Sequence, residues 1–75
     1  MINNLVKIRS GQNNKGIKLK AKECAGGMGV DPSTYSHYEN GKREPTLSSL
    51  EILSNWLYKE HEIDVTLDDF FTIED

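Results

Sequence analysis

The segment GVDPSTYSHYENGKREPTL, residues 29–47, decides the fold of this chain. It opens with a turn, after which Asp31-Pro32 supplies the capping side chain and first residue that favour the start of a helix. Tyr35 and Tyr38 are three residues apart and share the inward face of that helix. Asn40-Gly41 ends it, because glycine readily adopts the left-handed conformation after a last helical turn. The segment therefore predicts a short helix between two turns.

Two helices are predicted ahead of this segment. In the first, Leu5 and Ile8 lie on one face, which Ile2 extends. The polar residues 10–18, with glycines among them, predict an extended link. The second helix has apolar residues at helical spacing, namely Ile17, Ala21, Cys24, Ala25 and Met28. Glycine disfavours helix by about 1 kcal/mol relative to alanine. At Gly26-Gly27, either the last turn frays or a neighbouring backbone lies too close for side chains.

Two further helices are predicted after the segment. Thr46 caps the first of them, whose apolar stripe consists of Leu47, Leu50, Leu53 and Leu57. Residues 58–65 are mostly polar and predict a second extended link. Thr66 caps a short last helix, and the core is closed by Ile63, Val65, Leu67, Phe70 and Phe71. We therefore predict an all-α fold of five helices in a single domain, residues 1–75, with the last helix over Leu67–Phe71 and no strand.

The composition indicates one small domain. The chain has 75 residues, of which 36% are hydrophobic, and such a core supplies roughly 3–5 kcal/mol of net stability. The single cysteine, Cys24, excludes an internal disulfide and a cysteine-based zinc site, so it is expected in the core and no cofactor is expected. We find no membrane-spanning or signal-peptide pattern and expect a cytoplasmic protein. Since no catalytic arrangement and no small-molecule site is evident, we expect no enzymatic activity.

The charge is distributed unevenly along the chain. Residues 1–45 hold eight basic and four acidic side chains, whereas residues 46–75 hold one basic and eight acidic, for a net charge of −3. This asymmetry indicates a basic face for a polyanion and an acidic remainder that faces away. The alternative is that a small domain scatters its charge unevenly by chance.

Two helices joined by a tight glycine turn form the helix-turn-helix arrangement. The string Tyr38-Glu39-Asn40-Gly41-Lys42-Arg43, followed by Pro45, resembles the Cro/repressor-type (XRE-like) helix-turn-helix family. The resemblance extends back to residues 5–9 and forward to residues 66–71, and it implies a lambda-repressor-like, DNA-binding domain. The chain departs from the family in three ways. Both links are longer than usual, and Lys20-Ala21 stands where the family has a serine or threonine cap and a phosphate-binding glutamine.

The resemblance also implies a role for individual residues. An α-helix fits the major groove, and residues near its N-terminal end reach base edges. The implied base-reading residues are Pro32, Ser33, Ser36 and His37, of which His37 discriminates best because its ring can donate to guanine. The implied phosphate contacts are Thr34, Asn40, Lys42 and Arg43, with Lys20 and Lys22 in place of the missing glutamine. Glu39 is expected to form a structural ion pair with Arg9.

Ile52 and Trp56 are four residues apart and lie off the leucine stripe. Either they form an exposed apolar patch for another molecule, or the residues 58–64 or the C-terminal tail fold back over them. In the first case they would contribute to a homodimer through the C-terminal half. A two-fold dimer places two reading helices about 34 Å apart on one face of DNA. His61 carries no functional signal.

The leading hypothesis is a sequence-specific, repressor-like transcriptional regulator that binds a palindromic operator in double-stranded DNA. The alternative is a protein-interaction module or an antitoxin subunit on the same fold, with weak or no DNA binding. The missing glutamine and the acidic C-terminal half favour the alternative. The basic N-terminal half and the intact Asn40-Gly41-Lys42-Arg43 favour the leading hypothesis.

Overall fold

Four α-helices and one 3-10 turn make up residues 4–71, the part of the chain that the computed structural model describes. The helices are α1 (Leu5–Arg9), α2 (Ala21–Met28), α3 (Pro32–Glu39) and α4 (Leu47–His61), and the turn is η1 (Asp68–Phe70). No strand occurs in these residues, apart from an isolated bridge between Ser10 and Lys18. The all-α prediction is confirmed. The count of five α-helices is not, because the predicted last helix forms only η1.

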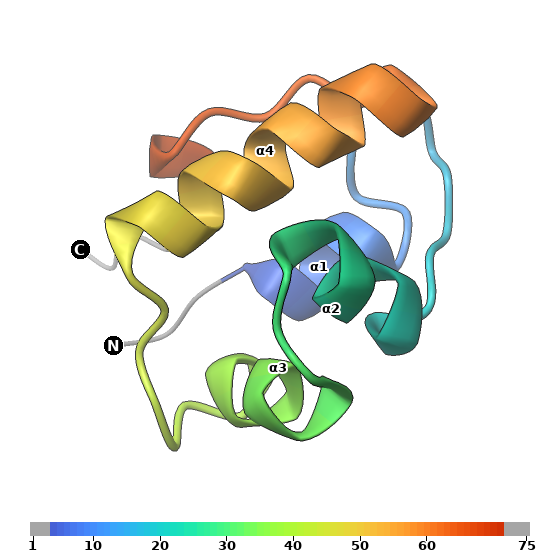
Figure 1. Ribbon diagram of the computed structural model, residues 1–75. Coiled ribbons are helices and arrows are strands. Elements are labelled where there is room, and N and C mark those ends of the chain that lie inside the picture. Colours follow the sequence, from blue (N-terminus) through green and yellow to red (C-terminus); the bar gives the residue numbers. More distant parts are fainter. Residues whose placement is uncertain (1–3, 72–75) are drawn as a thin grey trace, which may run out of the picture.

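The helix α2 lies at the centre of the fold. It packs against both α4 and α3, which lie on opposite sides of the molecule in Figure 1, and α1 packs against α3. Each helix turns its predicted apolar face inward, and the buried core consists of Leu5, Ile8, Leu19, Cys24, Ala25, Met28, Tyr35, Tyr38, Leu50, Leu53, Leu57, Ile63 and Phe70. Ile2 lies outside the described residues. Leu47 is an exception, since it is the first residue of α4 and remains 64% exposed.

The second helix begins at Ala21, with Lys20 at the cap position, as the family resemblance implies, and not at Ile17, where its apolar stripe begins. Residues 18–20 are held in extended form against the end of α1, because Lys18 bridges to Ser10 and the Leu19 amide donates to the Arg9 carbonyl at 2.6 Å. Backbone groups that are engaged in this way are not available to a helix. Ile17 therefore packs against the core from the link and not from α2.

The fourth helix ends later than predicted, at His61. Glu62 adopts the left-handed conformation with φ +56°, and its amide donates to the Tyr58 carbonyl at 2.9 Å. The amide of the buried Ile63 donates to the Leu57 carbonyl at 3.1 Å, which completes the helix end. The second link is thus shorter than the predicted residues 58–65, because Tyr58 and the residues up to His61 are helical.

The predicted capping residues make different contacts from one another. The Thr46 hydroxyl accepts from the Ser49 amide at 3.1 Å, as expected. Asp31 makes no such cap, and its carboxylate instead accepts from the Thr34 hydroxyl at 2.5 Å, which lowers the pKa of Asp31. Thr66 does not cap the last turn either, because its amide and hydroxyl both donate to the Asp69 carboxylate, at 2.8 and 3.1 Å. Two of the three predicted side-chain caps are therefore wrong.

The ring of Trp56 explains Gly27, the second glycine of the pair in α2, where the helix neither frays nor meets a neighbouring backbone. A Cβ at Gly27 would lie 2.2 Å from the ring, whereas a Cβ at Gly26 would meet nothing within 4 Å. The His61 ring stands edge-on to the Trp56 ring, with the two centroids 5.1 Å apart. Trp56 is therefore partly buried between α2 and His61, so of the two alternatives the ring of Trp56 follows the second, in which a residue of the segment 58–64 covers it. Ile52 remains 49% exposed.

Candidate nucleic-acid interface

The outward side of α3 carries the residues that were expected to read bases. Pro32, Ser33 and Ser36 are exposed and His37 is partly exposed, while Tyr35 on the opposite side is buried in the core. Thr34 is partly buried, and its hydroxyl points to Asp31. The structure thus brings the four residues to one helix and leaves their side chains accessible. Their contact with DNA stays a prediction.

A compact loop follows α3 and holds two basic side chains in solvent. Gly41 has φ +80°, the Lys42 amide donates to Asn40 Oδ1 at 3.2 Å, and the Arg43 amide donates to the His37 carbonyl at 3.2 Å. These bonds fold the loop back onto the last turn of α3. The side chains of Asn40, Lys42 and Arg43 are all exposed.

Exposed cations without a carboxylate partner lie near both ends of α3. Lys20 and Lys22 stand at the start of α2, and Lys42 and Arg43 follow α3; within residues 4–71 none of the four forms an ion pair. Figure 1 shows the start of α2 and the loop after α3 at opposite ends of α3. The described acidic residues of the C-terminal half are exposed on α4 and on the segment that follows it. Most of the exposed carboxylates therefore lie on other elements than these four cations, with Glu23, Asp31 and Glu44 as exceptions.

Sequence reasoning missed Lys18, which belongs to the same group. It is exposed, it has no carboxylate partner among residues 4–71, and it directly precedes Leu19 and Lys20. The signal that could have found it is the alternation of lysines at positions 18, 20 and 22. Lys15, by contrast, has its ammonium 3.8 Å from the Glu62 carboxylate.

The ion pair between Arg9 and Glu39 ties α1 to α3. Arg9 Nε lies 2.5 Å from Glu39 Oε2, and Arg9 Nη2 donates to Glu39 Oε1 at 2.9 Å. The two side chains are 24% and 10% exposed. The hydrogen bond to Glu39 raises the pKa of the Arg9 guanidinium, which therefore stays charged. This is the pair that the family resemblance implies, and it fixes the far end of α3.

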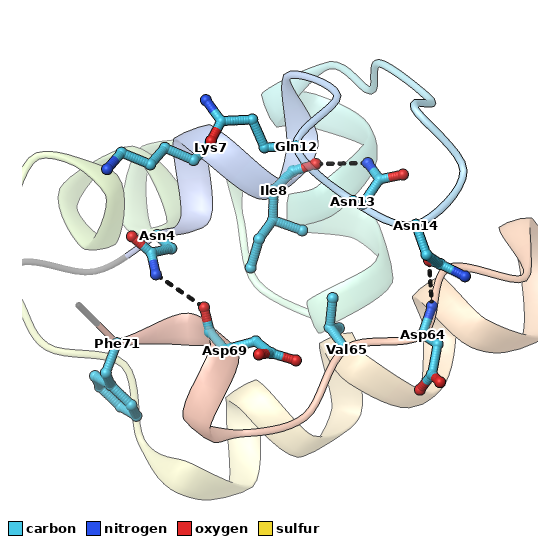
Figure 2. Close-up of a pocket in the computed structure, with 10 residues that line it drawn as sticks. All are labelled: Asn4, Lys7, Ile8, Gln12, Asn13, Asn14, Asp64, Val65, Asp69 and Phe71. Carbon is cyan, nitrogen blue, oxygen red and sulfur yellow. Dashed lines mark hydrogen bonds between the residues drawn. The ribbon is translucent and has the colours of Figure 1, made fainter. Parts of the chain in front are cut away.

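A polar groove of about 580 Å³ lies where α1 and the first link meet the C-terminal segment (Figure 2). Asn4 Nδ2 donates to the Asp69 carbonyl at 3.0 Å, and Asn14 Oδ1 accepts from the Asp64 amide at 2.9 Å. The groove is thus a seam that is held by hydrogen bonds along both edges.

Within residues 4–71, no group of His, Cys, Asp and Glu side chains could hold a metal ion. No helix of the described chain is suited to crossing a membrane.

The exposed α3, placed by a turn after α2, is the arrangement that comparison with known families also identifies. The family model described as helix-turn-helix matches residues 13–57. The chain belongs to the helix-turn-helix family of the Cro/repressor (XRE) type. The match covers the helix-turn-helix itself, most of the first link and most of α4. Searches of curated proteins and of solved structures give no match. DNA is the partner that this helix-turn-helix membership indicates.

Proposed function

We propose that this helix-turn-helix protein is a sequence-specific repressor of transcription that reads a palindromic operator in the major groove. The observation that supports this most is the placement of Lys20 and Lys22 at the start of α2 and of Lys42 and Arg43 on the loop after α3, near opposite ends of the exposed α3. Cations near both ends of a helix that lies in the groove can bind phosphates of the DNA backbone, while the outward side chains contact base edges. The base-reading residues in this proposal are Pro32, Ser33, Ser36 and His37, and Thr34 and Asn40 add phosphate contacts.

The second part of the proposal is a homodimer through the C-terminal half. Because one α3 reaches only a few base pairs, two copies related by a two-fold axis are needed to select a site. The helix α4 offers exposed apolar side chains for this contact, namely Leu47, Ile52 and Tyr58. Trp56 takes little part, because its ring packs on Gly27. Glu51 and Glu60 repel their counterparts, so we expect a weak dimer that the operator reinforces.

Selection of binding sites from random duplex DNA tests this function. We expect a palindromic sequence whose half-sites lie about 34 Å, or one helical turn, apart, and two chains for each duplex in sedimentation. Ile52→Glu should lower affinity for the full site and leave binding to a single half-site unchanged. Val6→Glu is the matched control, because it places the same charge on an exposed apolar position of α1, which is 43% exposed.

The competing function is a protein-interaction module or antitoxin subunit, and the absence of glutamine at Ala21 favours it. If the protein passes through heparin at low salt and selects no duplex sequence, DNA binding is rejected and the interaction module takes its place. If one chain saturates the selected site and the protein sediments as a monomer at high concentration, only the dimer is rejected. In either form the proposal assigns a binding function and no catalytic one.

A further inference from the structure

The link between α1 and α2, residues 10–20, is shaped by one of its own side chains. Asn13 Nδ2 donates to the carbonyls of Ile8 and Ile17, at 2.8 and 2.9 Å. Asn13 Oδ1 accepts from the amides of Lys15 and Ile17, at 3.0 and 3.3 Å. Figure 2 shows Asn13 turned toward Ile8 at the end of α1. A single amide group therefore closes the link on itself and holds it against α1.

The tip of the link is anchored to the C-terminal half of the chain. Asn14 accepts from the Asp64 amide at 2.9 Å, as Figure 2 shows, and the Lys15 ammonium lies 3.8 Å from Glu62. In Figure 1 the tip passes close to the end of α4, after which the link descends to the start of α2. The ammonium of Lys15 thus forms an ion pair with Glu62 of the acidic C-terminal half.

The second half of the link is extended, and Arg9 connects it to α3 through hydrogen bonds. Leu19 is buried, its amide donates to the Arg9 carbonyl at 2.6 Å, and its carbonyl accepts from Arg9 Nη1 at 3.4 Å. The same guanidinium binds Glu39 on α3. Because successive side chains of an extended segment point to opposite sides, the inward Leu19 leaves Lys18 and Lys20 facing outward.

The stem of Lys18 lies beside Gly11, where an added Cβ would be 3.5 Å from Lys18 Cγ. Lys18, Lys20 and Lys22 form a run of outward cations that leads into α2, and none has a carboxylate partner within residues 4–71.

We propose that the link is a preformed arm that contacts the DNA phosphate backbone through Lys18, in addition to the contacts of Lys20 and Lys22, with Asn13 as the positioning residue. This inference rests on the proposed function, because duplex DNA is the partner. Phosphates match the chemistry of unpaired ammonium groups on an extended segment. An arm that is ordered before binding avoids the entropy loss that a flexible loop of this length would incur.

Lys18→Ala tests the contact, with the selected duplex titrated at several salt concentrations. One lost phosphate contact should lower affinity about five- to tenfold at 0.1 M salt, and should reduce the slope of log K against log salt by about 0.9. Lys18→Arg should retain both values, because it keeps the charge. Lys59→Ala is the matched control, since it removes an exposed lysine from α4, and it should change neither.

A double-mutant cycle tests the positioning role of Asn13. Asn13→Ala should lower affinity and slope in the wild-type chain, and should lower neither further in the Lys18→Ala chain. A purely structural role would instead lower affinity equally in both backgrounds and would overturn that part. If Lys18→Ala binds like wild type while wild type binds DNA, the arm is rejected and the proposed function stands. If wild type binds no duplex at all, both are rejected.

Discussion

Arg9 and Glu39 form a two-point ion pair that joins the end of α1 to the end of α3, with contacts of 2.5 and 2.9 Å. The carboxylate is only 10% exposed, so a change that removes the arginine leaves a nearly buried charge. Such a loss costs more than the pair itself contributes, because the stranded group remains desolvated.

The first prediction concerns this pair. Arg9→Met should lower the free energy of unfolding by about 2–3 kcal/mol, at the low end of the range for a stranded buried charge, because Arg9 is still 24% exposed. Arg9→Met with Glu39→Leu should recover much of this loss. Chemical denaturation followed by circular dichroism measures both. Equal stabilities for the single and double variants would show that Glu39 is not stranded.

The second prediction uses the adjacent glycines of α2. Gly27→Ala should destabilise the protein by roughly 1–3 kcal/mol, because the new methyl group would overlap the Trp56 ring. Gly26→Ala, one residue earlier, should stabilise it by about 1 kcal/mol, since the site is open and alanine favours helix. Melting temperatures of the two variants, compared with wild type, should move in opposite directions. A shift in the same direction would place the ring elsewhere.

The third prediction concerns the loop after α3. Lys42→Ala and Arg43→Ala should weaken binding to every DNA sequence alike, and each should reduce the salt slope by about 0.9 for one lost phosphate contact. Titrations of a selected and an unrelated duplex at several salt concentrations measure both effects. A changed order of preference among sequences would show that these side chains read bases.

The fourth prediction concerns the outward side of α3. His37→Ala and Ser36→Ala should relax the preference at one or two base pairs, which costs about 1–3 kcal/mol at the preferred site. Site selection with the double variant measures the preference directly. If the selected sequence is the same as for wild type, base reading must lie elsewhere in the protein, for example in the first link.

The fifth prediction concerns the only cysteine. Cys24 is 1% exposed, and burial raises the pKa of its thiol, so the group stays neutral at pH 7 and above. The thiol should react with a disulfide reagent much more slowly in the native protein than in denaturant, because the reactive thiolate is scarce and covered. Rapid reaction in the native state would contradict its place in the core.

The parts of the fold that sequence could predict are those set by local rules. Tyr35 and Tyr38 follow from helical spacing, and Gly41 follows from the conformation that a helix end requires. The end of α4 could not be predicted, because Glu62 takes a left-handed conformation that its residue type does not signal. The mistaken prediction for Asp31 has a similar cause, since the Thr34 hydroxyl competes for its carboxylate.

Contacts between distant segments were also out of reach, except for the Arg9–Glu39 pair that the family resemblance implies. The candidate site residues Pro32, Ser33 and Ser36 could be placed on one exposed helix side because they are close in sequence. Trp56 could not be placed, because its partner Gly27 lies on another helix. The proposed role of Lys18 depends on Arg9 and Asn13, whose hydrogen bonds appear only when the link is folded.

The packing of Trp56 on Gly27 also provides an intrinsic fluorescence probe of the structure. Trp56 is the only tryptophan of the chain, and it lies at the boundary between α2, the first helix of the helix-turn-helix, and α4. Its indole emission should therefore follow any separation of these two helices, with no dye attached. The His61 ring stands edge-on to it with centroids 5.1 Å apart, so loss of this ring contact adds a second change in the emission. Titration with operator DNA can thus show directly whether α4 moves when α3 binds.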